Sequence, residues 1–290
     1  MNSKLKKREA LAGIGFVAPN TLMVLCFSVI PIIACLILSF TKYSVLDSPS
    51  WIGLANYQSM LKDDTVKSAL KNTAIYVLVT VPLETIISVV LAAIIAERFR
   101  NRFGNFVKAA LFIPVLASPA TVCTLWNLLL SNIGPINQFL KKSGLGIINF
   151  MGSTKITIFV VCFVCIWTTV GYLLIVLYAG IMDIPKELYN AADVDGATTV
   201  QKFFHITLPS LKGPLLFSMI MGTIWAFQEF DVVQILTGGG PGNSTISLVV
   251  TVYRAAFKES RMGYACAISI LLLVCVLICS GIQKALVKED

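Results

Sequence analysis

Residues 183–214 read DIPKELYNAADVDGATTVQKFFHITLPSLKGP, and this stretch is neither an apolar span nor a plain loop. Pro185 suits the first turn of a helix, where its missing N–H would have no partner. Asp195-Gly196 is a stop and turn signal, and Leu208-Pro209 predicts the end of a second helix because the residue before a proline avoids the α region. Apolar residues follow helical spacing on both sides of the glycine: Leu188, Ala191, Ala192 and Val194 before it, and Val200, Phe203, Phe204 and Ile206 after it. The stretch therefore predicts two short helices joined by a glycine turn.

The same residues resemble a family signature. Asn190-Ala191-Ala192, Gly196, Ile206 and Leu208-Pro209 match the spacing of the cytoplasmic "EAA" loop of binding-protein-dependent ABC importer permeases. Asn190 stands where the signature has Glu, and Glu187 lies one turn earlier on the same helix face. The resemblance implies that 183–212 is a coupling loop that docks on a separate ATPase subunit. The residues expected at that contact are Glu187, Leu188, Tyr189, Asn190, Ala191, Ala192, Asp193, Asp195 and Gly196.

Composition places the chain in a membrane. Its 290 residues are 57% hydrophobic and only 13% charged, whereas a soluble domain has about 25% charged residues. A plain amphipathic helix on the membrane surface is therefore the alternative interpretation of residues 186–209. The formal net charge of +8 suits the anionic cytoplasmic leaflet and does not require a nucleic-acid partner.

Apolar runs predict an all-α integral membrane protein with six transmembrane helices in a single permease domain, residues 1–290. We expect Pro31 to kink the first span and Pro114 and Pro119 to break the third. The six expected spans are approximately 10–40, 73–96, 109–130, 156–181, 215–236 and 263–286.

Basic residues orient the chain. Both termini lie on one side of a six-span protein, and the side with more Lys and Arg in short loops faces the cytoplasm. One side holds thirteen: Lys4, Lys6, Lys7, Arg8, Arg98, Arg100, Arg102, Lys108, Lys186, Lys202, Lys212, Lys284 and Lys288. The longer opposite loops hold ten: Lys42, Lys62, Lys67, Lys71, Lys141, Lys142, Lys155, Arg254, Lys258 and Arg261. We therefore expect both termini and the 183–212 loop to be cytoplasmic, in a multi-pass protein of the bacterial cell membrane.

The resemblance extends beyond the central loop. Three pieces are similar to outer-loop pieces of the carbohydrate-uptake branch, of the maltose and glycerol-phosphate permease type. They are WIGLANY at 51–57 with Asn72-Thr73, Gly134-Pro135-Ile136-Asn137 with Gly144-Leu145, and LTGGGPG at 236–242. The resemblance implies the type I ABC importer permease fold and transport of a sugar or oligosaccharide. Two interpretations of residues 238–242 remain: a turn alone, or a turn that also contacts a solute-binding protein.

The chain contains no Walker A pattern, so it has no such loop for ATP phosphates. We expect it not to be an enzyme and to carry no cofactor, with ATP and magnesium bound by partner subunits. The implied partners are a second permease in a heterodimer, two ATP-binding cassette subunits, an extracytoplasmic solute-binding protein, the sugar and membrane lipid. No nucleic acid and no metal site are expected, since His205 is the single histidine and the cysteines lie in apolar runs.

Polar and aromatic residues within two spans predict a sugar pathway. Carboxylates and amides bind sugar hydroxyls, and aromatic faces stack on sugar rings. The resemblance to maltose-type permeases implies substrate contacts from these two spans, and the expected pathway residues are Trp167, Gly171, Tyr172, Trp225, Gln228 and Glu229. Bonding of Glu229 and Asp231 to helices of the partner subunit is the alternative.

Glu84 is a further carboxylate inside an apolar run, for which we expect a structural hydrogen bond to a neighbouring helix. Glu84, Glu229 and Asp231 also leave an ion-coupled secondary transporter, or an ABC permease for a non-sugar solute, as alternative functions.

Overall fold

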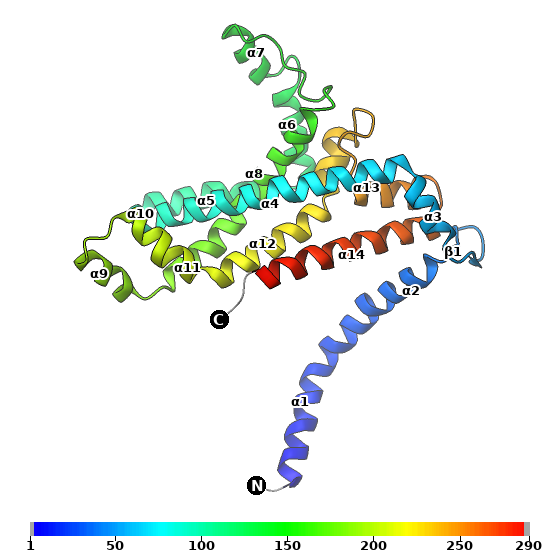
Figure 1. Ribbon diagram of the computed structural model, residues 1–290, viewed down its shortest axis with the longest axis horizontal. Helices are drawn as coiled ribbons and strands as arrows, with labels where there is room; N and C mark the ends of the chain where they lie inside the picture. The colour runs from blue at the N-terminus through cyan, green and yellow to red at the C-terminus, as the bar shows by residue number, and fades with distance from the viewer. Residues whose placement is uncertain (1–2, 287–290) are drawn as a thin grey trace. The chain divides into compact units, whose positions relative to one another are not determined.

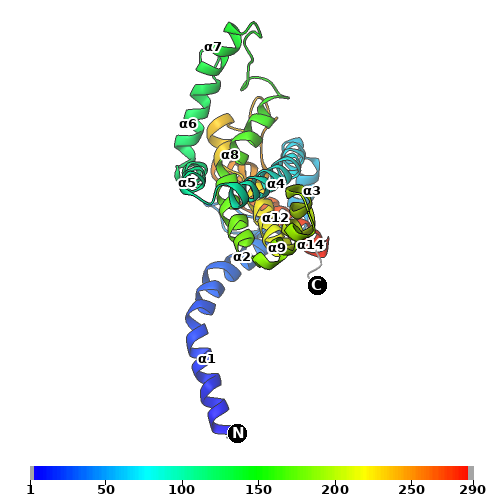
Figure 2. The same cartoon turned by 90° about the vertical axis from the view of Figure 1, so that its left-hand side faces the viewer.

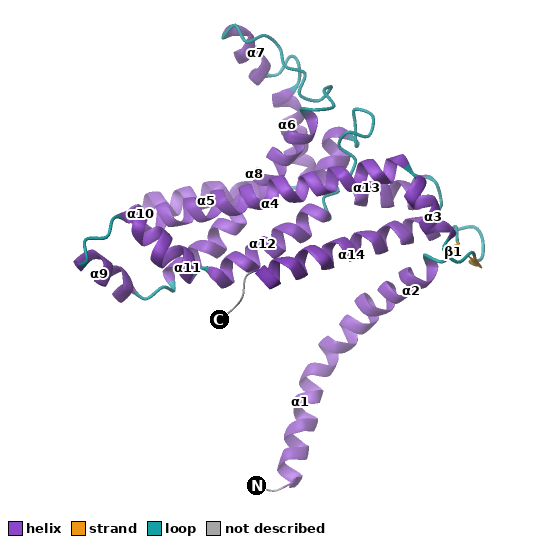
Figure 3. Cartoon of the chain, viewed as in Figure 1, coloured by secondary structure: helices purple, strands orange, loops and turns teal. Residues whose placement is uncertain are grey.

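The computed structural model describes residues 3–286, and helices hold most of them (Figure 3). The chain divides into two units, which are described separately. The first comprises residues 1–62 and 252–271, and the second comprises residues 63–251 and 272–290. Lys288, one of the thirteen basic residues, lies outside the described residues.

The first unit begins with a long, apolar helical run. Pro31 lies within one continuous helical run, at the second residue of α2, which directly follows the π-helical turn η1. A two-stranded antiparallel sheet then pairs Thr41 with Trp51. The elements of this unit are α1 (Ser3–Val24), η1 (Leu25–Val29), α2 (Ile30–Leu38), β1 (Thr41–Lys42), β2 (Ser50–Trp51), α3 (Ala55–Lys62), η4 (Arg254–Lys258) and the first part of α14 (Met262–Leu286).

The second unit is built around α4 (Asp64–Arg98), which packs along α8 (Thr157–Met182) and α12 (Lys212–Phe227) (Figure 1). α5 (Arg102–Leu116) covers α8 from another side. The remaining elements are α6 (Pro119–Leu130), α7 (Pro135–Lys142), α9 (Lys186–Val194), α10 (Thr199–Lys202), η2 (Phe203–Thr207), α11 (Leu208–Ser210), η3 (Val233–Thr237), most of α13 (Leu248–Tyr253) and the end of α14.

Small residues allow α4 and α8 to approach closely. Ala92 and Ala96 on α4 are fully or almost fully buried and pack in one cluster with Leu174 and Leu177 of α8. Leu211, between α11 and α12, has no exposed surface and belongs to the same cluster. Close packing of small residues is a main source of helix association in a bilayer. The cluster therefore ties the end of the 183–212 loop to the helical core.

Four helices in the described residues are long and apolar enough to cross a membrane, or up to six if each of two bent pairs is counted as one span. One pair joins Arg102–Leu116 to Pro119–Lys142 at an angle of 100°, and Figure 2 shows α6 turning away from α5. The other joins Thr199–Ser210 to Lys212–Phe227 at 71°.

The third expected span is broken at one of the two prolines and not at the other. Pro114 lies inside α5, while the break falls at Ala117 and Ser118. Pro119 then occupies the first turn of α6, and the Ser118 hydroxyl accepts the Thr121 N–H at 3.3 Å. The prediction of a break at Pro114 is therefore wrong, whereas the break before Pro119 is confirmed.

The expected pair of short helices in 183–214 is present, with one correction. α9 and α10 flank Gly196, but the second helix does not end at Leu208-Pro209. It continues through η2 into α11, and the chain turns at Leu211 instead. Pro209 is tolerated because the π-helical turn η2 directly precedes α11 and carries the helix past the proline.

Three asparagines in the outer-loop pieces bind loop backbone. The Asn137 side chain is fully buried, donates to the Ser131 and Ile148 carbonyls at 3.0 Å each, and accepts the Ile148 N–H at 2.9 Å. Asn72 donates to the carbonyls of Asn243 and Ile246, and Asn56 donates to those of Ser39 and Thr41. These sequence pieces therefore shape loops, because buried amides satisfy backbone groups that have no helical partner.

Candidate functional site

The first candidate site is the coupling segment, defined as α9, the Gly196 turn, α10 and η2. No residue of α9 is buried, and Val194 is 89% and Leu188 48% exposed. Seven of the nine residues expected at the ATPase contact are exposed: Glu187, Leu188, Asn190, Ala191, Asp193, Asp195 and Gly196. Exposed apolar and small residues on a helix, without a partner among residues 3–286, suit docking on another protein.

Tyr189 and Ala192 are the two exceptions, since both are partly buried. The Tyr189 hydroxyl lies 2.9 Å from the Thr207 hydroxyl on η2, and Asp193 accepts from the Lys202 ammonium at 2.6 Å. The hydrogen bond to Asp193 raises the pKa of Lys202. α9 is therefore fastened to the helices that follow it.

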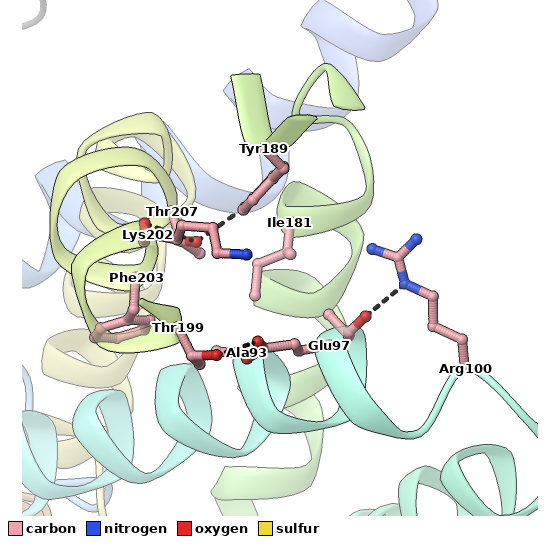
Figure 4. A pocket seen from close by; sticks show the side chains of 10 residues that line it. Ala93, Glu97, Arg100, Ile181, Tyr189, Thr199, Lys202, Phe203 and Thr207 are labelled. Carbon is pink, nitrogen blue, oxygen red and sulfur yellow. Dashed lines mark hydrogen bonds between the residues drawn. The ribbon is translucent and has the colours of Figure 1, made fainter. Parts of the chain in front are cut away.

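A further hydrogen bond connects the coupling segment to the core helix α4. The Thr199 hydroxyl donates to the Glu97 carboxylate at 2.7 Å, near the end of α4 (Figure 4). A cavity of about 190 Å³ separates the segment from α4 and α8, with Ile181 and Phe203 among its apolar lining and Arg100 at its rim (Figure 4). The Thr199–Glu97 hydrogen bond and the packing of Phe203 against the buried cluster of α4 and α8 therefore connect the segment to the core.

Gly196 ends α9 in a left-handed conformation, with φ +76°. The Ala197 N–H donates to the Ala192 carbonyl at 2.9 Å and the Gly196 N–H to the Asp193 carbonyl at 3.1 Å. This pattern satisfies the last free carbonyls of the helix and strongly favours glycine. No atom lies within 4 Å of the position that a Cβ would take, so backbone conformation and not space requires the glycine.

The second candidate site is the transmembrane cavity, a space of about 490 Å³ lined by α5, α6, α8 and the chain after α12. Its volume lies in the range of ligand pockets, roughly 300–1,000 Å³. The lining comprises Pro114, Val115, Ala117, Pro119, Val122, Thr168, Thr169, Tyr172, Trp225, Gln228, Glu229, Phe230, Asp231 and Val232. Four of the six residues expected in the pathway therefore meet here: Tyr172, Trp225, Gln228 and Glu229.

Two helix interruptions border the cavity, one between α5 and α6 at residues 117–118 and one after α12. α12 ends at Phe227, and residues 228–230 are not helical before a helical turn resumes at Asp231. The expected span 215–236 is therefore not continuous. Irregular backbone within a membrane is tolerated where it lines a cavity. Such broken helices mark substrate sites in transporters.

Aromatic and polar groups share the wall of the cavity. The rings of Tyr172 and Trp225 meet edge to face, with centroids 5.3 Å apart. Gln228 is exposed, as is Asp231, which the prediction of pathway residues left out. The signal that could have found Asp231 was its place in QEFD beside Glu229, once the helix break is known.

Glu229 is held by this chain itself. Its Oε1 accepts the Val232 N–H at 2.9 Å and its Oε2 accepts from the Cys165 thiol at 3.4 Å, while the Ser247 hydroxyl donates to its backbone carbonyl at 2.8 Å. The carboxylate therefore caps the helical turn that resumes after the break, as an acceptor at a helix start does. Glu229 orders the cavity wall as well as lining it.

The other two expected pathway residues do not line the cavity. Trp167 meets Trp126 edge to face at 5.5 Å, in a cluster with Phe163. Gly171 lies where α8 crosses α5 so closely that a Cβ would overlap the Leu111 carbonyl oxygen. Both residues pack between helices in this structure, and their part in the pathway stays a prediction. Only tertiary structure reveals which α8 face meets α5.

Glu84 does not form the expected hydrogen bond. Its side chain is 3% exposed, and its Oε1 has no partner among the described residues. This oxygen occupies the space that a Cβ on Gly222 of α12 would take. A glycine on the neighbouring helix, and not a hydrogen-bond donor, accommodates the carboxyl group.

Comparison with known proteins decides the family. The model of the binding-protein-dependent transport system inner membrane component matches residues 75–289. The chain belongs to this family. This permease is thus a membrane component of a transport system and not an enzyme, as predicted from the resemblance.

Curated relatives match almost the whole permease. It is 35% identical over 93% of its length to the arabinooligosaccharides transport system permease protein AraP of Bacillus subtilis, of which the match covers 87%. It is 32% identical to the trehalose/maltose transport system permease protein MalF of Thermococcus litoralis, covering 96% of this chain and 94% of that one.

The fold also matches a solved structure. A crystal structure of a bacterial ABC transporter involved in import of the acidic polysaccharide alginate has a TM-score of 0.85 at 23% identity, covering 98% of this permease and 97% of that chain. The type I ABC importer permease fold expected from the sequence is thereby confirmed.

Proposed function

We propose that the permease carries a sugar or oligosaccharide through the transmembrane cavity in an ATP-driven importer. The supporting observation is the cavity wall, where the Tyr172–Trp225 pair adjoins the exposed amide of Gln228. Aromatic rings present apolar faces and amides present both donors and acceptors, a combination that suits sugar rings and hydroxyls. The names of AraP and MalF, which refer to arabinooligosaccharides and to trehalose and maltose, support the same substrate class.

The proposed assembly contains a second permease, two ATP-binding cassette subunits and an extracytoplasmic solute-binding protein that delivers the sugar. ATP and magnesium are bound by the cassette subunits, since the permease sequence has no Walker A loop. An alginate transporter related in fold was solved in complex with a periplasmic protein that holds an alginate pentasaccharide, which supports the last partner.

The coupling segment is the proposed contact with the ATPase. α9 offers Leu188 and Val194 as exposed apolar side chains. The Tyr189 and Asp193 contacts hold α9 to α10 and η2, and the Thr199 contact binds the segment to α4. ATP-driven closure of the cassette subunits then displaces α9 and, through Glu97, the end of α4. A rigid element biased by a ligand at a second site is the physical requirement for such coupling.

The proposed orientation places both termini and the coupling segment in the cytoplasm of a bacterial cell. The density of Lys and Arg in the short loops supports it. Lipid contact is supported by the exposed apolar surface of the first helices, on which Phe16 is 87% and Phe27 76% exposed.

Trp225→Ala and Gln228→Ala are expected to lower uptake three- to tenfold in proteoliposomes that hold the complete importer. Each removes a cavity group that contacts sugar, while the helix break and its Glu229 cap stay in place. Radiolabelled uptake with internal ATP measures the effect.

Leu125→Ala, an exposed α6 side chain outside the cavity lining, is the matched control and is expected to transport normally. Unchanged rate and apparent affinity in both cavity variants would remove the cavity from the pathway. Uptake driven by an ion gradient without ATP would instead favour a secondary transporter.

A further inference from the structure

The transmembrane cavity has a one-sided charge. Its described lining includes two carboxylates, Glu229 and Asp231, but no Lys, Arg or His. The remaining polar lining groups are neutral: Thr168, Thr169, Tyr172, Trp225 and Gln228. An ion inside such a wall is screened less than one in bulk water, so the sign of a charge on the transported molecule matters.

The two carboxylates have different roles. Both oxygens of Glu229 already accept hydrogen bonds from Val232 and Cys165. Asp231 is exposed and forms no hydrogen bond or ion pair within the described part of the chain. An exposed carboxylate is negatively charged at neutral pH. Asp231 is therefore the group free to meet a transported molecule.

Family membership leaves the charge of the substrate undecided. Relatives and fold neighbours are named for arabinooligosaccharides and for trehalose and maltose, but also for sulfoquinovosyl glycerol and for the acidic polysaccharide alginate. The charge of the cavity wall in this chain indicates which substrate charge it favours, and the names of the relatives do not.

We propose that Asp231 makes this permease selective for uncharged sugars and disfavours acidic sugars such as uronates. This inference rests on the proposed sugar pathway. A carboxylate accepts hydrogen bonds from the hydroxyls of a neutral sugar, and such charge-assisted bonds are stronger than neutral ones. The same carboxylate repels a sugar carboxylate, and no cation in the described lining compensates.

The test uses matched sugars that differ in charge. The complete importer in lipid nanodiscs is titrated with pairs of sugars, one charged and one uncharged. One set pairs galacturonate oligosaccharides with their uncharged methyl esters. The other pairs neutral glucose and arabinose oligosaccharides with the same oligosaccharides carrying a terminal uronate. Binding is followed by the quenching of Trp225 fluorescence, with the Trp225→Phe importer as the signal control. In every pair that binds, the uncharged member is expected to bind at least tenfold more tightly.

Asp231→Asn supplies the second arm. It removes the charge and keeps the shape, so we expect the preference within each pair to fall below threefold. Neutral sugars are expected to bind three- to tenfold more weakly, because they lose a charge-assisted hydrogen bond. Asp64→Asn, at a 92% exposed carboxylate at the start of α4, is the matched control and should keep the wild-type preference.

Each outcome has a defined meaning. Equal binding within pairs by the wild-type importer, or an undiminished preference in Asp231→Asn, would overturn the charge selectivity and leave the sugar pathway standing. Failure of every sugar in the panel to bind would overturn both the selectivity and the pathway.

Discussion

Replacing Gly196 with valine is expected to lower ATP-driven uptake at least tenfold, while the permease still inserts and assembles. Gly196 has φ +76°, a conformation that costs an ordinary L-residue about 1–2 kcal/mol and a β-branched residue more. Valine therefore alters the end of α9 and with it the two hydrogen bonds that Ala192 and Asp193 accept. Uptake and ATP hydrolysis, measured on the same proteoliposomes, show whether hydrolysis continues without transport.

Gly196→Asn is the matched control, because asparagine tolerates the left-handed conformation far better than valine. It is expected to retain most of the uptake, and the open space around Gly196 accepts the larger side chain. Wild-type transport by the valine variant would show that the geometry of this turn does not matter for coupling.

Gly171→Ala is expected to destabilise the permease without weakening its apparent affinity for the transported sugar. A methyl group at this position meets the Leu111 carbonyl, so α8 and α5 must separate. Overpacking of this kind costs about 1–3 kcal/mol. Thermal unfolding of the purified importer and its yield from membranes measure the loss.

Gly281→Ala provides the comparison for Gly171→Ala. Gly281 is also inside a helix, α14, but no atom lies within 4 Å of the added methyl group. This variant should be at least as stable as the wild type, since alanine favours helix more than glycine. A fully stable Gly171→Ala importer with weaker sugar binding would show that Gly171 belongs to the pathway and is not a packing residue alone.

The coupling segment was predictable because its signals are local. Gly196 ends a helix through its own backbone conformation, and Thr198 begins the next through a capping box with Gln201. The prediction failed only at Pro209, where a π-helical turn carries the chain past a residue that usually ends a helix.

The transmembrane cavity was predictable only in part. Tyr172, Trp225, Gln228 and Glu229 were expected because aromatic and polar groups are conspicuous in an apolar span. The break at 228–230 contains neither proline nor glycine and was not expected. It is held by tertiary contacts, such as the bond from Ser247 to the Glu229 carbonyl, which lie 18 residues apart in the sequence.

Packing roles were the least accessible from sequence. Gly171 and Trp167 share a span with Tyr172, yet one meets the backbone of α5 and the other meets Trp126. The space for the Glu84 carboxyl group likewise depends on Gly222, which lies on a different helix and is far from Glu84 in the sequence. Which helix face meets which neighbour is set by the whole bundle.

The central claim is that α9 contacts an ATP-hydrolysing subunit, and site-specific photocrosslinking tests it most directly. A photoreactive amino acid replaces Val194, which is 89% exposed on α9, and in a control replaces Leu46, which is 90% exposed in the predicted outer loop. After irradiation of the complete importer, we predict a covalent adduct between position 194 and a nucleotide-binding subunit, and none from position 46. Absence of that adduct from position 194 would contradict the account. Modification of position 194 itself by a membrane-impermeant reagent applied to the outside of intact cells would contradict it as well.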